Sequence, residues 1–142
     1  MASFRIEHRL GVPAPADRIW EALADLAGWP QWNPWHVRAE GVLRIGEPLR
    51  LVQADSSEID YRVVDWVPDT QILLRASQTF GLLTRMRFME IEKLADDGCV
   101  FSNGEIWSGP LAKYVGAPVK RAAWRGFEAM SEALSARVVA SR

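Results

Sequence analysis

The chain has 142 residues, of which 49% are apolar and 25% are charged, and its formal net charge is −1. This length and composition are typical of one globular domain, so we expect a single domain over residues 1–142. The balanced charge gives no basic surface for nucleic acid, and no apolar run is long enough for a stable membrane insertion. Cys99 is the only cysteine, which excludes an intrachain disulfide and argues against a cysteine metal site. The N-terminal residues do not resemble a signal peptide, so we expect a cytoplasmic protein.

The first segment alternates charged and bulky side chains, which predicts a half-buried strand over residues 4–10. A short helix is expected to follow, with Pro15 near its start and Gly28 and Pro30 at its end. Residues 29–35 (WPQWNPW) are too aromatic for an ordinary solvated loop, and their two prolines prevent a long helix.

From Val37 onwards, short apolar runs alternate with turn residues. They predict six strands, at residues 37–45, 48–54, 59–67, 71–78, 84–94 and 99–108. The strongest hairpin signal is Asp96-Asp97-Gly98. Consecutive strands joined by such short turns pair antiparallel, so the segment predicts a meander. Residues 111–115 could form a short helical lead-in to the C-terminal segment.

The longest periodic segment is residues 118–138, which we expect to form one helix. Ala123, Phe127, Met130, Leu134 and Val138 fall at helical spacing and form one apolar stripe. No helix of similar length is available as a partner, so the stripe must be buried against the sheet. Seven tryptophans then suggest either ordinary core packing or an aromatic-lined cavity between sheet and helix.

Several local strings resemble the superfamily of START, Bet v 1-like and polyketide-cyclase-like (SRPBCC) proteins. They are Val12-Pro13-Ala14, residues 29–34 (WPQWNP), residues 97–101 (DGCVF) and residues 105–109 (EIWSG). The resemblance covers nearly the whole chain. It implies an α+β helix-grip fold, in which a curved seven-stranded antiparallel sheet wraps around a long C-terminal helix, with two short helices between strands 1 and 2. The superfamily includes carriers, cyclases and accessory proteins, so the fold does not choose between them.

Alternation places Phe101, Asn103, Glu105 and Trp107 on one face of the last strand. The resemblance implies that this face looks into a cavity. Glu105 would then lie beside aromatic walls, where it could bind a ligand or act as an acid or base. Two other interpretations stay open: a neighbouring arginine could pair with Glu105, or the opposite face of the strand could be the buried one.

Other residues are weaker candidates. His8 lies on the apolar face of the first strand and is more often a core residue than a base. Arg87 shares a face with Met89, whereas Arg85 could equally lie on a solvated face. His36 follows Trp35 and could lie at the mouth of a pocket, but we expect it to be exposed to solvent. The full set of candidate ligand-binding residues is His8, Trp35, Arg87, Met89, Phe101, Asn103, Glu105, Trp107, Trp124, Phe127 and Met130.

Three functions are compatible with these features. The first is binding or carrying of a hydrophobic or aromatic, lipid- or polyketide-like small molecule in the cavity. The second is a polyketide cyclase or dehydratase that uses Glu105, with His8 as a possible second group. The third is an accessory protein of another enzyme. No phosphate loop, nucleophile motif or metal-ligand spacing is present, so no cofactor and no metal are expected. A monomer and a homodimer are both compatible with the sequence.

Overall fold

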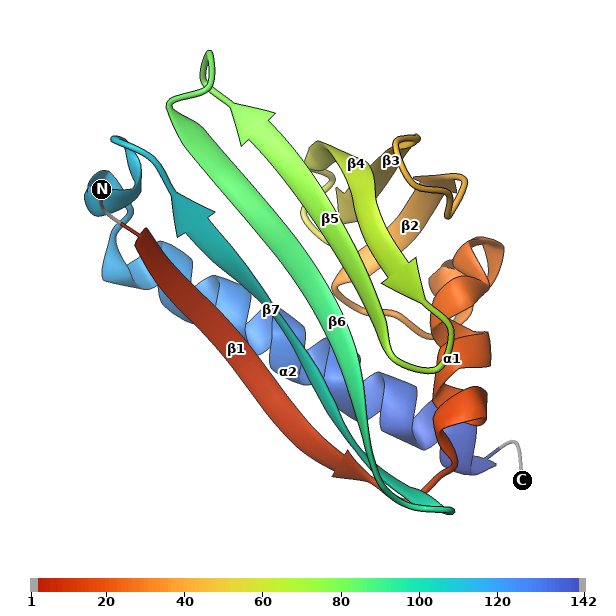
Figure 1. Cartoon of the computed structure of the whole chain (residues 1–142). Helices are drawn as coiled ribbons and strands as arrows, with labels where there is room; N and C mark the ends of the chain where they lie inside the picture. Colours follow the sequence, from red (N-terminus) through yellow and green to blue (C-terminus); the bar gives the residue numbers. More distant parts are fainter. Residues whose placement is uncertain (1–2, 141–142) are drawn as a thin grey trace.

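The computed structural model describes residues 3–140 and shows one sheet, several short helical segments and a long C-terminal helix (Figure 1). The strands are β1 (Ser3–Val12), β2 (His36–Gly41), β3 (Pro48–Gln53), β4 (Glu58–Val67), β5 (Gln71–Gln78), β6 (Leu83–Ala95) and β7 (Gly98–Ser108). The helical segments are α1 (Ala16–Ala24), the 3₁₀ turns η1 (Leu26–Gln31) and η2 (Ala112–Tyr114), and α2 (Ala117–Ala140).

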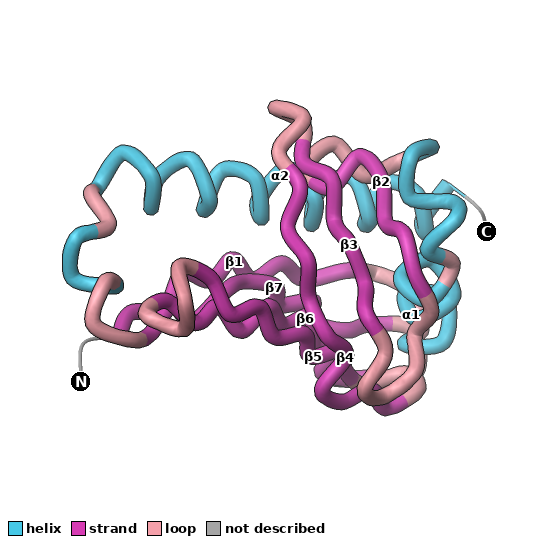
Figure 2. The backbone as a smooth tube through the Cα atoms, turned by 90° about the horizontal axis from the view of Figure 1, so that it is seen from above, coloured by secondary structure: helices cyan, strands magenta, loops and turns pink. Residues whose placement is uncertain are grey.

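The sheet is antiparallel throughout, with the spatial order β1-β7-β6-β5-β4-β3-β2. The chain therefore runs as a meander from β2 to β7, and β1 completes the sheet by pairing with β7. The sheet is strongly curved. In Figure 2, β2, β3 and β4 run upwards across α2, while β1, β7, β6 and β5 lie below the helix in the picture. This arrangement confirms the predicted α+β helix-grip fold.

The apolar stripe of α2 faces the sheet as predicted. Phe127, Met130 and Leu134 are each at most 1% exposed. The helix starts one residue before the predicted boundary and ends two residues after it. No helix within residues 3–140 is both long enough and apolar enough to cross a bilayer.

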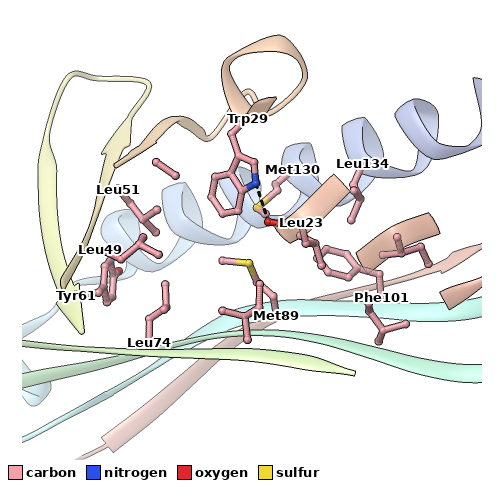
Figure 3. Close-up of a cluster of buried hydrophobic side chains, with 14 of the residues drawn as sticks. Leu23, Trp29, Leu49, Leu51, Tyr61, Leu74, Met89, Phe101, Met130 and Leu134 are labelled. Atoms are coloured by element: carbon pink, nitrogen blue, oxygen red, sulfur yellow. Dashed lines mark hydrogen bonds between the residues drawn. The ribbon is translucent and has the colours of Figure 1, made fainter. Parts of the chain in front are cut away.

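The larger hydrophobic core lies under the C-terminal half of α2, where α1 and η1 pack against the helix and the sheet (Figure 3). Trp29 from η1 is 1% exposed, and its indole nitrogen donates a hydrogen bond to the carbonyl oxygen of Leu23 at 3.1 Å. Trp32, which follows in the same aromatic segment, is only partly buried against this core, so Trp29 is its core tryptophan.

The second strand ends earlier than predicted, at Gly41 rather than residue 45. Gly41 has φ of +140°, and a Cβ atom there would lie 2.6 Å from the carbonyl oxygen of Pro48. The backbone leaves the ladder at this point in a conformation that only glycine adopts easily, so the pairing with β3 stops.

Candidate functional site

Glu105 on β7 lies inside the molecule, on the same face as Phe101 and Trp107, as the alternation predicted. It is 1% exposed and accepts hydrogen bonds from the hydroxyl of Tyr61 at 2.5 Å and from the indole nitrogen of Trp107 at 2.8 Å. Arg85 donates from Nε and Nη2 at 3.1 and 2.8 Å. The face that carries Glu105 is therefore the buried one, and the interpretation that a neighbouring arginine pairs with Glu105 is confirmed.

Arg85 therefore does not lie on a solvated face of the sheet. Its side chain is 12% exposed, and its guanidinium also lies over the ring of Trp107 at 4.3 Å. In the ladder of β6 and β7, Arg87 is directly opposite Glu105, yet the ion pair forms with Arg85 two residues away. This diagonal pairing leaves Arg87 without a carboxylate in hydrogen-bonding contact among the described residues.

Tyr61 reaches Glu105 from β4, which is 44 residues away in sequence. The tyrosine is 1% exposed. Burial and the negative charge of Glu105 raise the pKa of Tyr61 well above its usual value, so the phenol stays a proton donor. The tyrosine therefore keeps a proton to donate to the Glu105 carboxylate.

Arg87 is fully buried and uses all five of its N–H groups. It donates to His36 Nε2 at 3.1 Å, to the backbone oxygens of Phe88 and Gly104, and to Asn103 Oδ1 at 2.9 Å, and its fifth N–H points at the sulfur of Met130. Burial lowers the pKa of Arg87 to about 10, which leaves it charged at neutral pH. Its guanidinium lies 4.5 Å from the ring of Phe127.

His36 is 1% exposed, so the expectation that it lies in solvent is wrong. Asn33 explains its position, because Asn33 Oδ1 accepts hydrogen bonds from the backbone N–H groups of Trp35 and His36 and turns the chain inwards. Burial and the positive charges of Arg87 and Arg85 hold the pKa of His36 well below 6.5. The imidazole is therefore neutral, accepts at Nε2 and carries its proton on Nδ1.

Asn103 connects this network to α2. Its side-chain nitrogen donates to the hydroxyl of Ser131 at 2.6 Å and to the backbone oxygen of Phe127 at 3.2 Å. Asn103 and Ser131 are both fully buried. A chain of polar contacts thus runs from His36 on β2 through Arg87 and Asn103 to the middle of the helix.

Trp35 closes the same region from the loop before β2. Its ring lies edge-on to Phe127, with centroids 6.4 Å apart, and against Gly126 of α2. A Cβ atom at Gly126 would overlap the indole ring, so only glycine allows this contact. Trp35 is partly exposed and its ring nitrogen is buried without a hydrogen-bond partner in residues 3–140.

The remaining candidates divide into two groups. Met89, Phe101 and Met130 are fully buried in the larger core. His8 and Trp124 lie together at the β1 edge, where Trp124 is 40% exposed and donates to the backbone oxygen of Glu7. The structure therefore does not bring these two residues to Glu105.

Phe127, Met130 and Leu134 are buried against the sheet beneath α2, where a cavity was expected. A hollow of about 640 Å³ lies elsewhere, over β4 and β5 and the segment before β3. Its lining includes Arg62, Arg75 and Tyr61 but no residue of α2. Tyr61 is thus the residue that lies both beside this hollow and in the cluster around Glu105.

Arg85 and Tyr61 belong to the site but were not among the predicted ligand-binding residues, although the sequence pattern places both on buried faces. Arg85 shares the parity of Arg87, and Tyr61 alternates with Ile59 and Val63 on the buried face of β4. No group of three or more metal-ligating side chains is present within residues 3–140. The hydrogen bonds and charges of the site come from Glu105, Arg85 and Tyr61.

Comparisons with known proteins agree with this architecture. The sequence profile of the family described as polyketide cyclase / dehydrase and lipid transport matches residues 3–140. No curated protein matches the chain significantly in sequence.

Three solved structures illustrate the similarity. A START superfamily protein from Mycobacterium smegmatis is 23% identical, with a TM-score of 0.76 over 97% of this chain and 99% of that one. Norcoclaurine synthase from Thalictrum flavum, in complex with dopamine and hydroxybenzaldehyde, is 17% identical, with a TM-score of 0.75 over 99% and 89%. The Zhui aromatase/cyclase from Streptomyces sp. R1128 is 20% identical, with a TM-score of 0.72 over 96% and 94%. Identities this low establish the fold alone.

Proposed function

The chain belongs to the polyketide cyclase / dehydrase and lipid transport family, and from this membership we propose that it binds a hydrophobic or aromatic small molecule between α2 and the sheet. The observation that carries the proposal is the mixed character of this interior. Apolar side chains such as Phe127 and Met130 lie directly against the buried polar cluster of Arg87 and Asn103. Small-molecule sites are typically apolar with a few fixed polar groups that orient the ligand.

Trp35 is the side chain whose movement would admit such a molecule. It comes from a loop, is partly exposed, and its ring occupies the position between α2 and the polar cluster. If the ring of Trp35 moved out, an apolar ligand in its place would make the same contacts with Phe127 and Gly126. Met130, an unbranched side chain with several rotatable bonds, could adapt to the ligand from below.

The test is a titration with N-phenyl-1-naphthylamine, a neutral dye that fluoresces in apolar surroundings, together with native mass spectrometry of the freshly purified protein. We expect saturable dye binding, and at least about tenfold weaker binding in Met130→Trp, because the larger ring fills the proposed site. Phe80→Ala is the control, since Phe80 is fully exposed at the β5–β6 turn. Absence of saturable binding in the wild type would refute the proposal.

A second candidate is a cyclase- or dehydratase-type enzyme, and the contact between Tyr61 and Glu105 favours it. A phenol that donates to a carboxylate at 2.5 Å, beside Arg85, provides two groups able to exchange a proton with a bound substrate. Under this proposal Glu105→Gln retains dye binding, while conversion of a linear poly-β-ketone thioester falls by about a hundredfold or more. Chromatography of the cyclised product measures this loss, and an unchanged rate would exclude Glu105 as the acid or base.

A further inference from the structure

The buried charges beneath α2 do not balance. Glu105 is the only buried carboxylate within residues 3–140. It pairs with Arg85 and does not contact Arg87, the other buried arginine of the cluster. Tyr61 and His36 are neutral, as their shifted pKa values require. Two guanidinium groups against one carboxylate leave the cluster with one excess positive charge. Burial of a charge without a partner destabilises a protein, so we expect the excess positive charge to be neutralised by a partner.

Hydrogen-bond donors are also in excess. His36 Nδ1 carries a proton because Nε2 accepts from Arg87, and this N–H has no acceptor in residues 3–140. The ring N–H of Trp35 and the side-chain nitrogen of Asn33 are likewise buried without acceptors in that range. The rings of Trp35 and His36 lie 5.9 Å apart. Charge and hydrogen bonding therefore both indicate a missing acceptor, and not a missing donor.

The two arginines differ in what they can still bind. All five N–H groups of Arg87 are already committed to protein partners. Arg85 donates from Nε and Nη2, and its Nη1 makes no hydrogen bond within residues 3–140. Its side chain is also the more exposed of the two, at 12%. An incoming acceptor would therefore contact Arg85, while Arg87 would act on it through its charge.

We propose that the molecule bound by this protein is an apolar monoanion, whose single acidic group is held by Arg85 at the cationic cluster and whose apolar part lies against Phe127. The inference rests on the proposed function, because it names the chemical class of ligand for the same interior. One negative charge cancels the excess charge of the cluster, and its oxygens accept from Nη1 of Arg85, which has no hydrogen bond within residues 3–140.

The test compares two dyes of the same ring skeleton at pH 7. N-phenyl-1-naphthylamine is neutral, and 8-anilinonaphthalene-1-sulfonate carries one negative charge. We expect both to bind, with the sulfonate bound at least about tenfold more tightly. Binding of both dyes with equal affinity would overturn the inference and leave the proposed function intact. Binding of neither dye would overturn both.

Two variants test whether the preference for the sulfonate dye depends on Arg85. In Arg85→Met the charges of Arg87 and Glu105 cancel, so the preference for the sulfonate should fall to about one while the neutral dye still binds. The control is Arg9→Met, because Arg9 is 60% exposed on β1 and pairs with Glu92 at the surface. A preference that survives Arg85→Met, or that falls equally in Arg9→Met, would mean that the dye binds elsewhere and would overturn the inference.

Arg85→Met leaves Glu105 buried without its cation and could fail to fold. The double variant Arg85→Met with Glu105→Gln removes both charges of the pair, a change that proteins often tolerate. Arg87 then still supplies one positive charge, but the direct donor is gone, so the sulfonate should lose about tenfold in affinity relative to the wild type. An unchanged affinity in this folded variant would show that Arg85 does not hold the anion.

Discussion

The two halves of α2 cover two different kinds of interior. The C-terminal half places Leu134 and Val138 in the larger core, which is apolar and in which Trp29 has its hydrogen bond satisfied (Figure 3). The N-terminal half places Ala123 and Phe127 in a smaller cluster beside Trp35, next to the buried arginine network. Close apolar packing stabilises the fold at one end of the helix, whereas charge and unpaired donors at the other end create a site.

The largest loss of stability is expected from a substitution in the larger core. Trp29→Ala should lower the free energy of unfolding by about 3–5 kcal/mol, because a fully buried ring is removed. Denaturant unfolding measures the loss, and Trp32→Ala, a partly buried neighbour, should cost clearly less. Equal costs for the two variants would contradict the assignment of Trp29 as the core tryptophan.

The contact between Trp35 and Gly126 tests the smaller cluster. Gly126→Ala should destabilise the protein by about 1–3 kcal/mol, because the added methyl group overlaps the indole ring. In a Trp35→Ala background the same change should become neutral or stabilising by up to about 1 kcal/mol, since alanine favours a helix more than glycine does. Calorimetric unfolding of the four proteins measures this coupling, and strictly additive effects would show that the two residues do not touch.

His36 should make stability depend on pH. Because its pKa is lowered in the folded chain, the unfolded chain binds this proton first as the pH falls. The stability supplied by neutral His36 is therefore complete above about pH 6.5 and is lost below it, at up to about 1.4 kcal/mol per pH unit. Unfolding of the wild type and His36→Gln between pH 5 and 8 measures the difference, which should shrink as the pH falls. A constant difference would mean that His36 does not titrate with folding.

The smallest expected effect lies where the two halves meet. Ser131→Ala removes the hydroxyl that accepts from Asn103, and should cost about 1 kcal/mol. Ser135→Ala, one turn later and partly exposed, is the matched control and should change stability by less than about 0.5 kcal/mol. If Ser131→Ala were as neutral as its control, the link between the polar network and α2 would contribute little.

Much of the fold could be predicted because it depends on local periodicity. Alternation along β7 placed Glu105 on the buried face with Phe101, and helical spacing identified the stripe of Phe127, Met130 and Leu134. The two-residue turn at Asp96 and Asp97 joins β6 to β7 where the hairpin signal predicted it. Even the errors of strand length, such as the early end at Gly41, are changes of a few residues at a predicted element.

The partners within the site could not be predicted in the same way. Alternation gives the face on which Arg85, Arg87 and Glu105 lie. It gives neither the register of β6 and β7 nor the diagonal contact by which Arg85 reaches the carboxylate. Tyr61 comes from β4, which is separated from β7 by two strands of the sheet, and His36 is buried because the side chain of Asn33 turns its backbone inwards.

The sequence by itself thus determined which segments are strands and helices and which face of each is apolar, because side-chain periodicity depends only on neighbours along the chain. Only the tertiary structure decided that Arg85 pairs with the buried Glu105 and that Trp35 lies against Gly126. Such contacts join residues tens of positions apart, and their energies depend on burial and distance, which exist only once the chain has folded.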